Sequence, residues 1–323
     1  MIRGRAKRMA WMRWLLAISA PCMALGCGPP SSRPGSGGQD GGGEAPDASP
    51  GDDPTVVASV PPQGATNVYP FELYREGAAT LRRKRVQVTF NEAMDTSAGA
   101  VPLAGPAGAV RSIPAQWSAD ARTLLLEIGP PDPMDGGSLP LEYESSYTID
   151  LRALSSTAGV PLDDAQPGLA NGQLGFTTAA QDGLLEHACG HTFEDPFAYV
   201  VATPTPDNAP AVGTTHKRYT LQLPAVDMGA VHAGHVSQNI PLAGSTDMFT
   251  YTLFLSADVS AQVTDATSGE SIAVASLETP PVCELIRHAR TAVLTEGREY
   301  LLRFETSDTS TFELIFERDL VVP

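Results

Sequence analysis

Short stretches in which apolar and polar residues alternate recur along this chain from about residue 55 to its end. Val86, Val88 and Phe90, for example, alternate with polar residues. A strand places successive side chains on opposite faces, so this alternation predicts strands with one buried face. We expect strands at residues 55–60, 86–90, 124–128, 147–151 and 174–178, and then at 197–201, 218–223, 249–255, 260–264, 272–276, 300–304 and 312–316. We expect no long amphipathic helix.

The strand segments fall into two groups, which predicts an all-β fold with two β-sandwich domains in series. A chain of 323 residues exceeds what one hydrophobic core usually holds, so we expect two separate cores. The 30 Gly and 28 Pro residues fit many turns between short strands. The pattern predicts an Ig-like sandwich over residues 55–178 and a jelly-roll-like sandwich over residues 187–320, connected by residues 179–186.

The first 26 residues have the order of a secretory signal, with a basic start, an apolar stretch and then small residues. Ala24-Leu25-Gly26-Cys27 resembles the lipobox of bacterial lipoproteins, in which the cysteine becomes acylated. The resemblance implies a lipid anchor at Cys27, and Gly28 after it resembles the outer-membrane sorting pattern of bacteria with two membranes. An ordinary cleaved signal peptide is the alternative.

Residues 27–54 are rich in Gly, Pro and Ser and show no apolar period, which predicts a disordered linker. The chain after the leader is strongly acidic. Five of the 21 basic residues lie in the first 13 positions, so 21 − 5 = 16 basic residues remain against 37 acidic ones. Such a negative field repels phosphate backbones, and we expect no nucleic-acid partner.

Several segments of the first predicted sandwich resemble the SbsA-type bacterial Ig-like domain of surface-layer and other exported proteins. They are residues 59–65 (SVPPQGA), 88–95 (VTFNEAMD), 147–149 (YTI) and 176–178 (FTT). The resemblance covers residues 55–178 and implies a spacer or adhesion-type module without catalytic residues. Residues 69–85 are an insertion relative to that pattern, and we expect its basic run, residues 82–85, to be a solvated loop or strand end.

In the second predicted sandwich, residues 247–251 and 296–304 resemble in periodicity the β-sandwich appended to secreted bacterial peptidases. This resemblance implies no functional residue.

In the last predicted strand, Ile315 lies between the apolar residues Leu314 and Phe316. We therefore expect this strand to be buried on both faces.

The candidate chemistry lies in residues 186–191, Glu-His-Ala-Cys-Gly-His. If this stretch is extended, His187, Cys189 and His191 share one face. Two imidazoles four residues apart on a strand lie about 13 Å apart, so they can bind one ion only if the chain bends, for example at Gly190.

Further ligands could come from elsewhere in the chain, namely from His232 and His235 or His216, and from Glu194 or Asp195. His216 and His288 have basic neighbours, which disfavours both as ligands of a cation. Surface or hydrogen-bonded structural roles are the default for all six histidines. In the alternative, a site for zinc or copper, the ligands are His187, His191, His232 and His235.

Besides Cys27, which the lipobox resemblance assigns to the lipid anchor, Cys189 and Cys283 are the two cysteines after the first 26 residues. An exported protein meets oxidising conditions, so an even pair favours a Cys189–Cys283 disulfide over a thiolate ligand or a free thiol. With that disulfide, only histidines and carboxylates remain as metal ligands.

The chain has no Walker loop, dinucleotide fingerprint, G-x-S-x-G or H-E-x-x-H motif. The expected function is therefore a non-catalytic, lipid-anchored protein of the cell envelope, on the outer membrane where there are two. In it the Ig-like spacer presents the second sandwich to a protein or surface partner. The alternative is a periplasmic or surface protein that binds copper or zinc through histidines.

Overall fold

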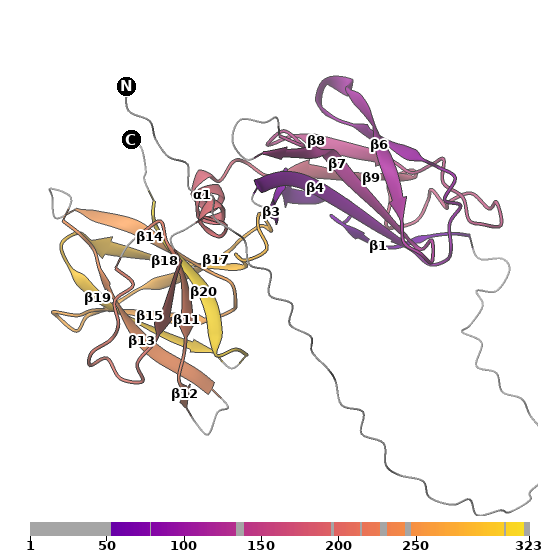
Figure 1. Ribbon diagram of the computed structural model, residues 1–323. Helices are drawn as coiled ribbons and strands as arrows, with labels where there is room; N and C mark the ends of the chain where they lie inside the picture. Colours follow the sequence, from indigo (N-terminus) through magenta and orange to yellow (C-terminus); the bar gives the residue numbers. More distant parts are fainter. Residues whose placement is uncertain are drawn as a thin grey trace, which may run out of the picture. The chain divides into compact units, whose positions relative to one another are not determined.

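The computed structural model describes residues 53–77, 79–133, 139–194, 197–213, 215–226, 231–242, 247–306 and 308–319. The predicted signal peptide, Cys27 and nearly all of the predicted linker lie outside these residues, as does Asp195. The all-β fold class is confirmed, because nearly all of the secondary structure is strand (Figure 1).

The strands up to residue 178 form one sheet of nine strands, in the order β1-β4-β7-β6-β5-β8-β9-β2, with β3 paired to β4. Alternation along these strands places one face inside, as in β9, where every second residue is buried. Their bounds are β1 Val56–Val60, β2 Ala65–Val68, β3 Glu72–Glu76, β4 Ala79–Phe90, β5 Ala100–Ala104, β6 Val110–Trp117, β7 Thr123–Pro133, β8 Ser146–Asp150 and β9 Gln173–Thr178. A short 3-10 turn, Pro106–Gly108, precedes β6.

The remaining strands form two sheets that enclose a shared core. The six-stranded sheet has the order β10-β11-β20-β14-β18-β17, and the five-stranded sheet has the order β12-β13-β19-β15-β16. Their bounds are β10 Phe197–Val201, β11 Arg218–Gln222, β12 Ala225–Val226, β13 Val231–Asn239, β14 Met248–Leu255, β15 Ser260–Asp265, β16 Ser271–Ile272, β17 Val274–Glu278, β18 His288–Thr295, β19 Glu299–Thr306 and β20 Thr311–Arg318. Figure 1 shows β13, β15 and β19 as one layer against β11, β14, β18 and β20.

Among the described residues, the buried hydrophobic side chains form three clusters, whereas we expected two separate cores. One lies within residues 56–176 and another within residues 198–316. The third combines residues from both sides of position 180, among them Tyr69, Phe71 and Leu185 with Val282 and Ile315. It forms because the segment before β4 and the helix α1, Gly183–His191, bury their apolar side chains against the segment between β17 and β18.

Two local expectations were wrong. Residues 183–191 form a helix instead of a connection followed by an extended stretch. The basic run 82–85 lies inside β4, where Lys84 is 4% exposed and lies 3.5 Å from Glu72, so the run is not solvated as a whole. The guanidinium of Arg83 lies 3.8 Å from the centre of the Tyr74 ring, which covers part of this strand.

The expectation that the last strand is buried on both faces is confirmed. In β20, Phe316 packs into the core between the two sheets, whereas Ile315 packs into the third cluster.

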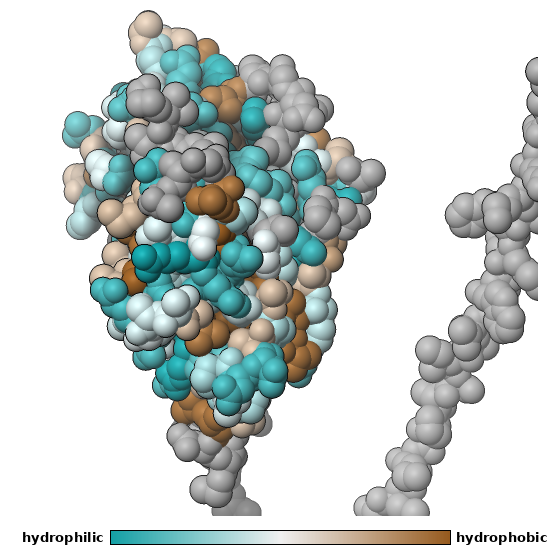
Figure 2. All heavy atoms as spheres, turned by 90° about the vertical axis from the view of Figure 1, so that its left-hand side faces the viewer, coloured by the Kyte–Doolittle hydropathy of each residue, from teal (hydrophilic) through white to brown (hydrophobic). Residues whose placement is uncertain are grey.

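Among the described residues, no helix is long and apolar enough to span a bilayer. On the face drawn in Figure 2, hydrophobic residues lie in small groups separated by hydrophilic ones.

Replacing Leu253 by alanine should reduce the free energy of unfolding by about 2–5 kcal/mol, because its side chain is fully buried in the core between the two sheets. Leu277→Ala is the matched control, since Leu277 lies in the same sheet and is 50% exposed. Urea denaturation of the mature chain measures both. Equal losses in the two variants would contradict this account of the core.

Candidate metal centre

The helix α1 begins at a clear N-cap. The Asp182 carboxylate accepts a hydrogen bond of 2.9 Å from the backbone N–H of Leu185, and Glu186 lies in the first turn, where a negative charge is favourable. Leu185, Ala188 and Cys189 are buried on one side of the helix. Residues four apart share one face of a helix, so His187 and His191 lie together on another side.

Three kinds of contact hold this helix in place. Cys189 forms a disulfide with Cys283, which confirms the predicted pair and removes the thiolate as a metal ligand. The hydroxyls of Tyr69 and Tyr143 both donate to the carboxylate of Glu186. Burial, together with these hydrogen bonds to Glu186, raises the pKa of both tyrosines above the ordinary value, so both hydroxyls keep their protons. After the helix, Arg218 donates to the carbonyl oxygen of Thr192.

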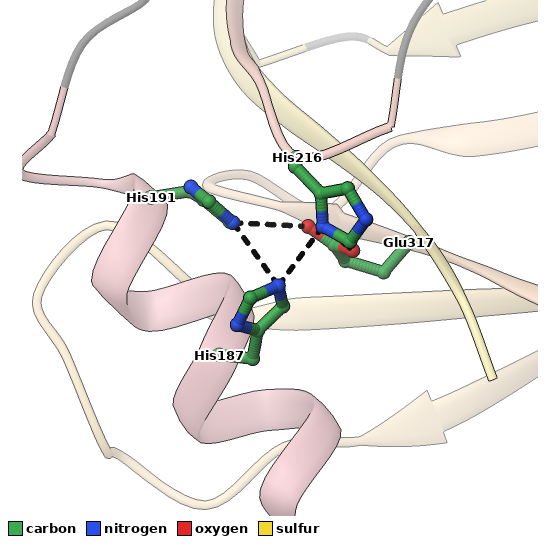
Figure 3. A group of neighbouring side chains, drawn as sticks. All are labelled: His187, His191, His216 and Glu317. Atoms are coloured by element: carbon green, nitrogen blue, oxygen red, sulfur yellow. Dashed lines mark hydrogen bonds and ion pairs between the residues drawn. The ribbon is translucent and has the colours of Figure 1, made fainter. Parts of the chain in front are cut away.

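Four side chains from three parts of the chain converge beside this helix (Figure 3). His187 and His191 come from α1, His216 from the segment before β11, and Glu317 from β20. Their nearest ligand atoms all lie within 4.8 Å of one another. The group could therefore hold a metal ion.

The distances inside the group are those of a ligand shell. Nε2 of His187 lies 2.9 Å from Nδ1 of His216 and 3.2 Å from Nε2 of His191. Glu317 places one oxygen 2.9 Å from Nδ1 of His216 and the other 3.8 Å from Nε2 of His191. Two ligands of a tetrahedral zinc ion lie roughly 3.3 Å apart, given bond lengths of about 2.0–2.1 Å.

The number of protons and lone pairs on the three imidazole rings also favours a bound cation at the centre of the group. Each neutral imidazole nitrogen carries either one proton or one lone pair. Nε2 of His187 has two imidazole nitrogens at hydrogen-bonding distance and can pair well with only one of them. A single cation at the centre would accept lone pairs from all three rings.

Glu317 is the one fully buried member of the group of four residues. Its side chain has no exposed surface, and neither carboxylate oxygen has a well-formed hydrogen bond to another described residue. Burial raises the pKa of this carboxyl to about 7. The backbone N–H of His216 opposes this shift only in part. A buried carboxylate with so little compensation is costly unless a positive charge lies next to it, which a metal ion would supply.

The surroundings of His191 and His216 favour the neutral form of both imidazoles. Burial, together with the positive charge that His187 and His216 can carry, lowers the pKa of His191 to about 4. Burial and His187 likewise lower the pKa of His216. Both rings are therefore uncharged at neutral pH and have a lone pair available for a metal ion.

The structure brings together only half of the predicted ligand set. His187 and His191 belong to the group, whereas His232 and His235 lie on β13 in the five-stranded sheet and are not part of it. These two residues are three apart on a strand, so their side chains point to opposite faces and cannot bind one ion together. Glu194 is exposed and also lies outside the group.

Sequence reasoning disfavoured His216 and missed Glu317. The basic neighbours of His216 are engaged elsewhere, since the Lys217 ammonium lies 5.3 Å from the centre of the Tyr219 ring and Arg218 contacts Glu313 and the Phe197 ring. The signal for Glu317 was present, because it lies two positions after Ile315 on a strand expected to be buried on both faces. A charged residue on that face requires a partner.

Comparison of the chain with models of known protein families finds no match, and comparison with curated proteins finds none either. The resemblance to SbsA-type domains therefore stays a prediction that depends on the residues quoted for it.

Replacing both Cys189 and Cys283 by alanine should lower the free energy of unfolding by about 2–4 kcal/mol, because the disulfide restrains a loop of 94 residues in the unfolded chain. Urea denaturation of the mature protein measures the loss. The two single variants are controls and should lose about as much, since each also removes the disulfide. Unchanged stability in the double variant would contradict the contribution of this bond.

Proposed function

We propose that this protein is a lipid-anchored protein of the bacterial cell envelope that binds one divalent transition-metal ion at His187, His191, His216 and Glu317. The observation that carries the proposal is the convergence of three imidazole nitrogens on a carboxylate with no exposed surface and no well-formed hydrogen bond to another described residue. The first group of strands then serves as the spacer, and the second carries the site.

Zinc is the ion that fits best. Three imidazole nitrogens and one carboxylate oxygen form a donor set that Zn²⁺ binds in tetrahedral geometry. Cys189 supplies no thiolate because it is in the disulfide, so the four residues of the group include no soft ligand for Cu⁺. Cu²⁺ binds imidazole sites more tightly than Zn²⁺ in general, so it is the competitor that an experiment must include.

An ion at this position would have a structural effect as well. It would join α1, the segment before β11, and β20, which are far apart in the sequence but adjacent around the group. Binding to the folded state alone stabilises a protein, by about 2.7 kcal/mol at a hundredfold excess over the dissociation constant. This role needs no catalytic group and agrees with the absence of an enzyme motif in the sequence.

Metal analysis of the mature chain, purified without an affinity tag and dialysed against zinc, should give one zinc ion per chain. The double variant His187→Ala/His191→Ala should lose it, because half of the ligand shell is gone. Glu317→Gln should bind at least about tenfold more weakly, since the amide brings no negative charge. Equilibration with both metals determines whether copper displaces zinc.

His288→Ala and His232→Ala are the matched controls, because both histidines lie outside the group. Each should retain one ion per chain. Metal-free wild-type protein, or equal loss of metal in the control variants, would refute the proposed site.

The lipid anchor is tested by Cys27→Ser. Acylation needs the thiol of Cys27, so the variant should move from the membrane fraction to the soluble fraction after cell lysis. Fractionation and immunoblotting of the two proteins measure this. A variant that stays in the membrane fraction would remove the anchor from the proposal.

A further inference from the structure

A cleft of about 1260 Å³ opens beside the metal site. His187, His216 and Glu317 belong to its lining, so a molecule in the cleft would reach the ion directly. His187 is exposed, and the side chain of His216 is 51% exposed. The site therefore differs from closed structural zinc sites, and zinc can take a fifth ligand.

The cleft is acidic. Asp182, Glu278 and Asp319 join Glu317 in its lining. Glu278 and Asp319 form no ion pair with another residue in the described ranges. Arg318 is the one lysine or arginine among the described lining residues, and its guanidinium already contacts the Glu296 carboxylate at 2.7 Å and covers the Phe249 ring at 3.4 Å. Four carboxylates thus outweigh the two charges of a divalent ion.

Threonine side chains add hydrogen-bonding capacity to the cleft. Thr250 and Thr252 of β14 and Thr291 of β18 line it, and Thr252 is paired with Thr291 across the two strands. A hydroxyl can both donate and accept, as the N–H and C=O groups of a peptide require. Phe254 and Leu277 give the same cleft an apolar part.

We propose, on the basis of the metal site described above, that this cleft binds a short basic peptide with one of its carbonyl oxygens on the ion. Ammonium groups of the peptide lie against Glu278 and Asp319, and the threonine hydroxyls bind its backbone. The carbonyl oxygen is a neutral ligand, so it can add to the coordination of zinc without placing a second negative charge beside Glu317.

Isothermal titration calorimetry of the metal-loaded, full-length mature protein with trilysine, trialanine, triglutamate and spermidine tests the charge requirement. Trilysine should bind saturably, trialanine more weakly, and triglutamate not measurably. The double variant Glu278→Gln/Asp319→Asn should weaken trilysine binding roughly fivefold, as expected for two partly exposed charge pairs. Glu299→Gln is the control, because Glu299 is exposed on β19 and does not line the cleft.

Visible absorption of the Co²⁺-loaded protein tests the contact with the ion. Trilysine should change the d–d bands, whereas spermidine, which has ammonium groups but no carbonyl, should leave them unchanged. Equal binding of trilysine and triglutamate, or an unaffected carboxylate double variant, would overturn the proposal. Equal spectral changes with spermidine and trilysine would overturn the carbonyl contact.

Failure of the metal site is distinguishable from failure of the cleft. If the protein binds no Co²⁺ or Zn²⁺, the proposed function and the carbonyl contact are both refuted, and calorimetry on the same sample still decides whether charge-dependent peptide binding exists. If Co²⁺ binds and trilysine does not, the metal site stands and the cleft proposal falls.

Discussion

The arrangement around α1 depends on one constraint, the burial of the Glu317 carboxylate. Glu317 follows the run Phe312 to Phe316 on β20, a strand with a hydrophobic cluster on each face, so the backbone places this charge out of contact with solvent. A carboxylate in such a place needs positive charge or hydrogen-bond donors. What surrounds it is a set of three imidazoles, two of which have a lowered pKa. Neutral imidazoles do not neutralise the charge of the buried carboxylate, but together with it they can bind a cation that does.

The helix that carries two of these imidazoles is fixed from several sides. The disulfide holds it to the segment between β17 and β18, and Glu186 accepts hydrogen bonds from Tyr69 and Tyr143. Both tyrosines belong to the part of the chain before residue 180, as do Phe71 and Leu73 of the third cluster. The ligands His187 and His191 are thus positioned by contacts from both groups of strands, and a ligand set held in advance loses little entropy when an ion binds.

The sequence predicted most strands because alternation is a local property. It predicted the disulfide because only Cys189 and Cys283 remain after the leader and the acylated Cys27. It did not predict α1, which is only nine residues long, although Asp182 before Leu184 and Leu185, followed by Glu186, resembles a helix start. As an extended stretch, this segment would place His187 and His191 about 13 Å apart, whereas the helix places both on one side. The approach of His216 and Glu317 comes from the pairing of β11 with β20, between residues some hundred positions apart, and no local pattern encodes it.

The central claim is that three imidazole nitrogens and the Glu317 carboxylate form the first ligand shell of a zinc ion. X-ray absorption at the zinc edge on the zinc-loaded mature protein measures that shell directly. We expect about four nitrogen or oxygen ligands at about 2.0–2.1 Å, with the outer-shell scattering of three imidazole rings, and a loss of one light-atom ligand in Glu317→Gln. A shell that contains sulfur, or one without imidazole scattering, would contradict the account.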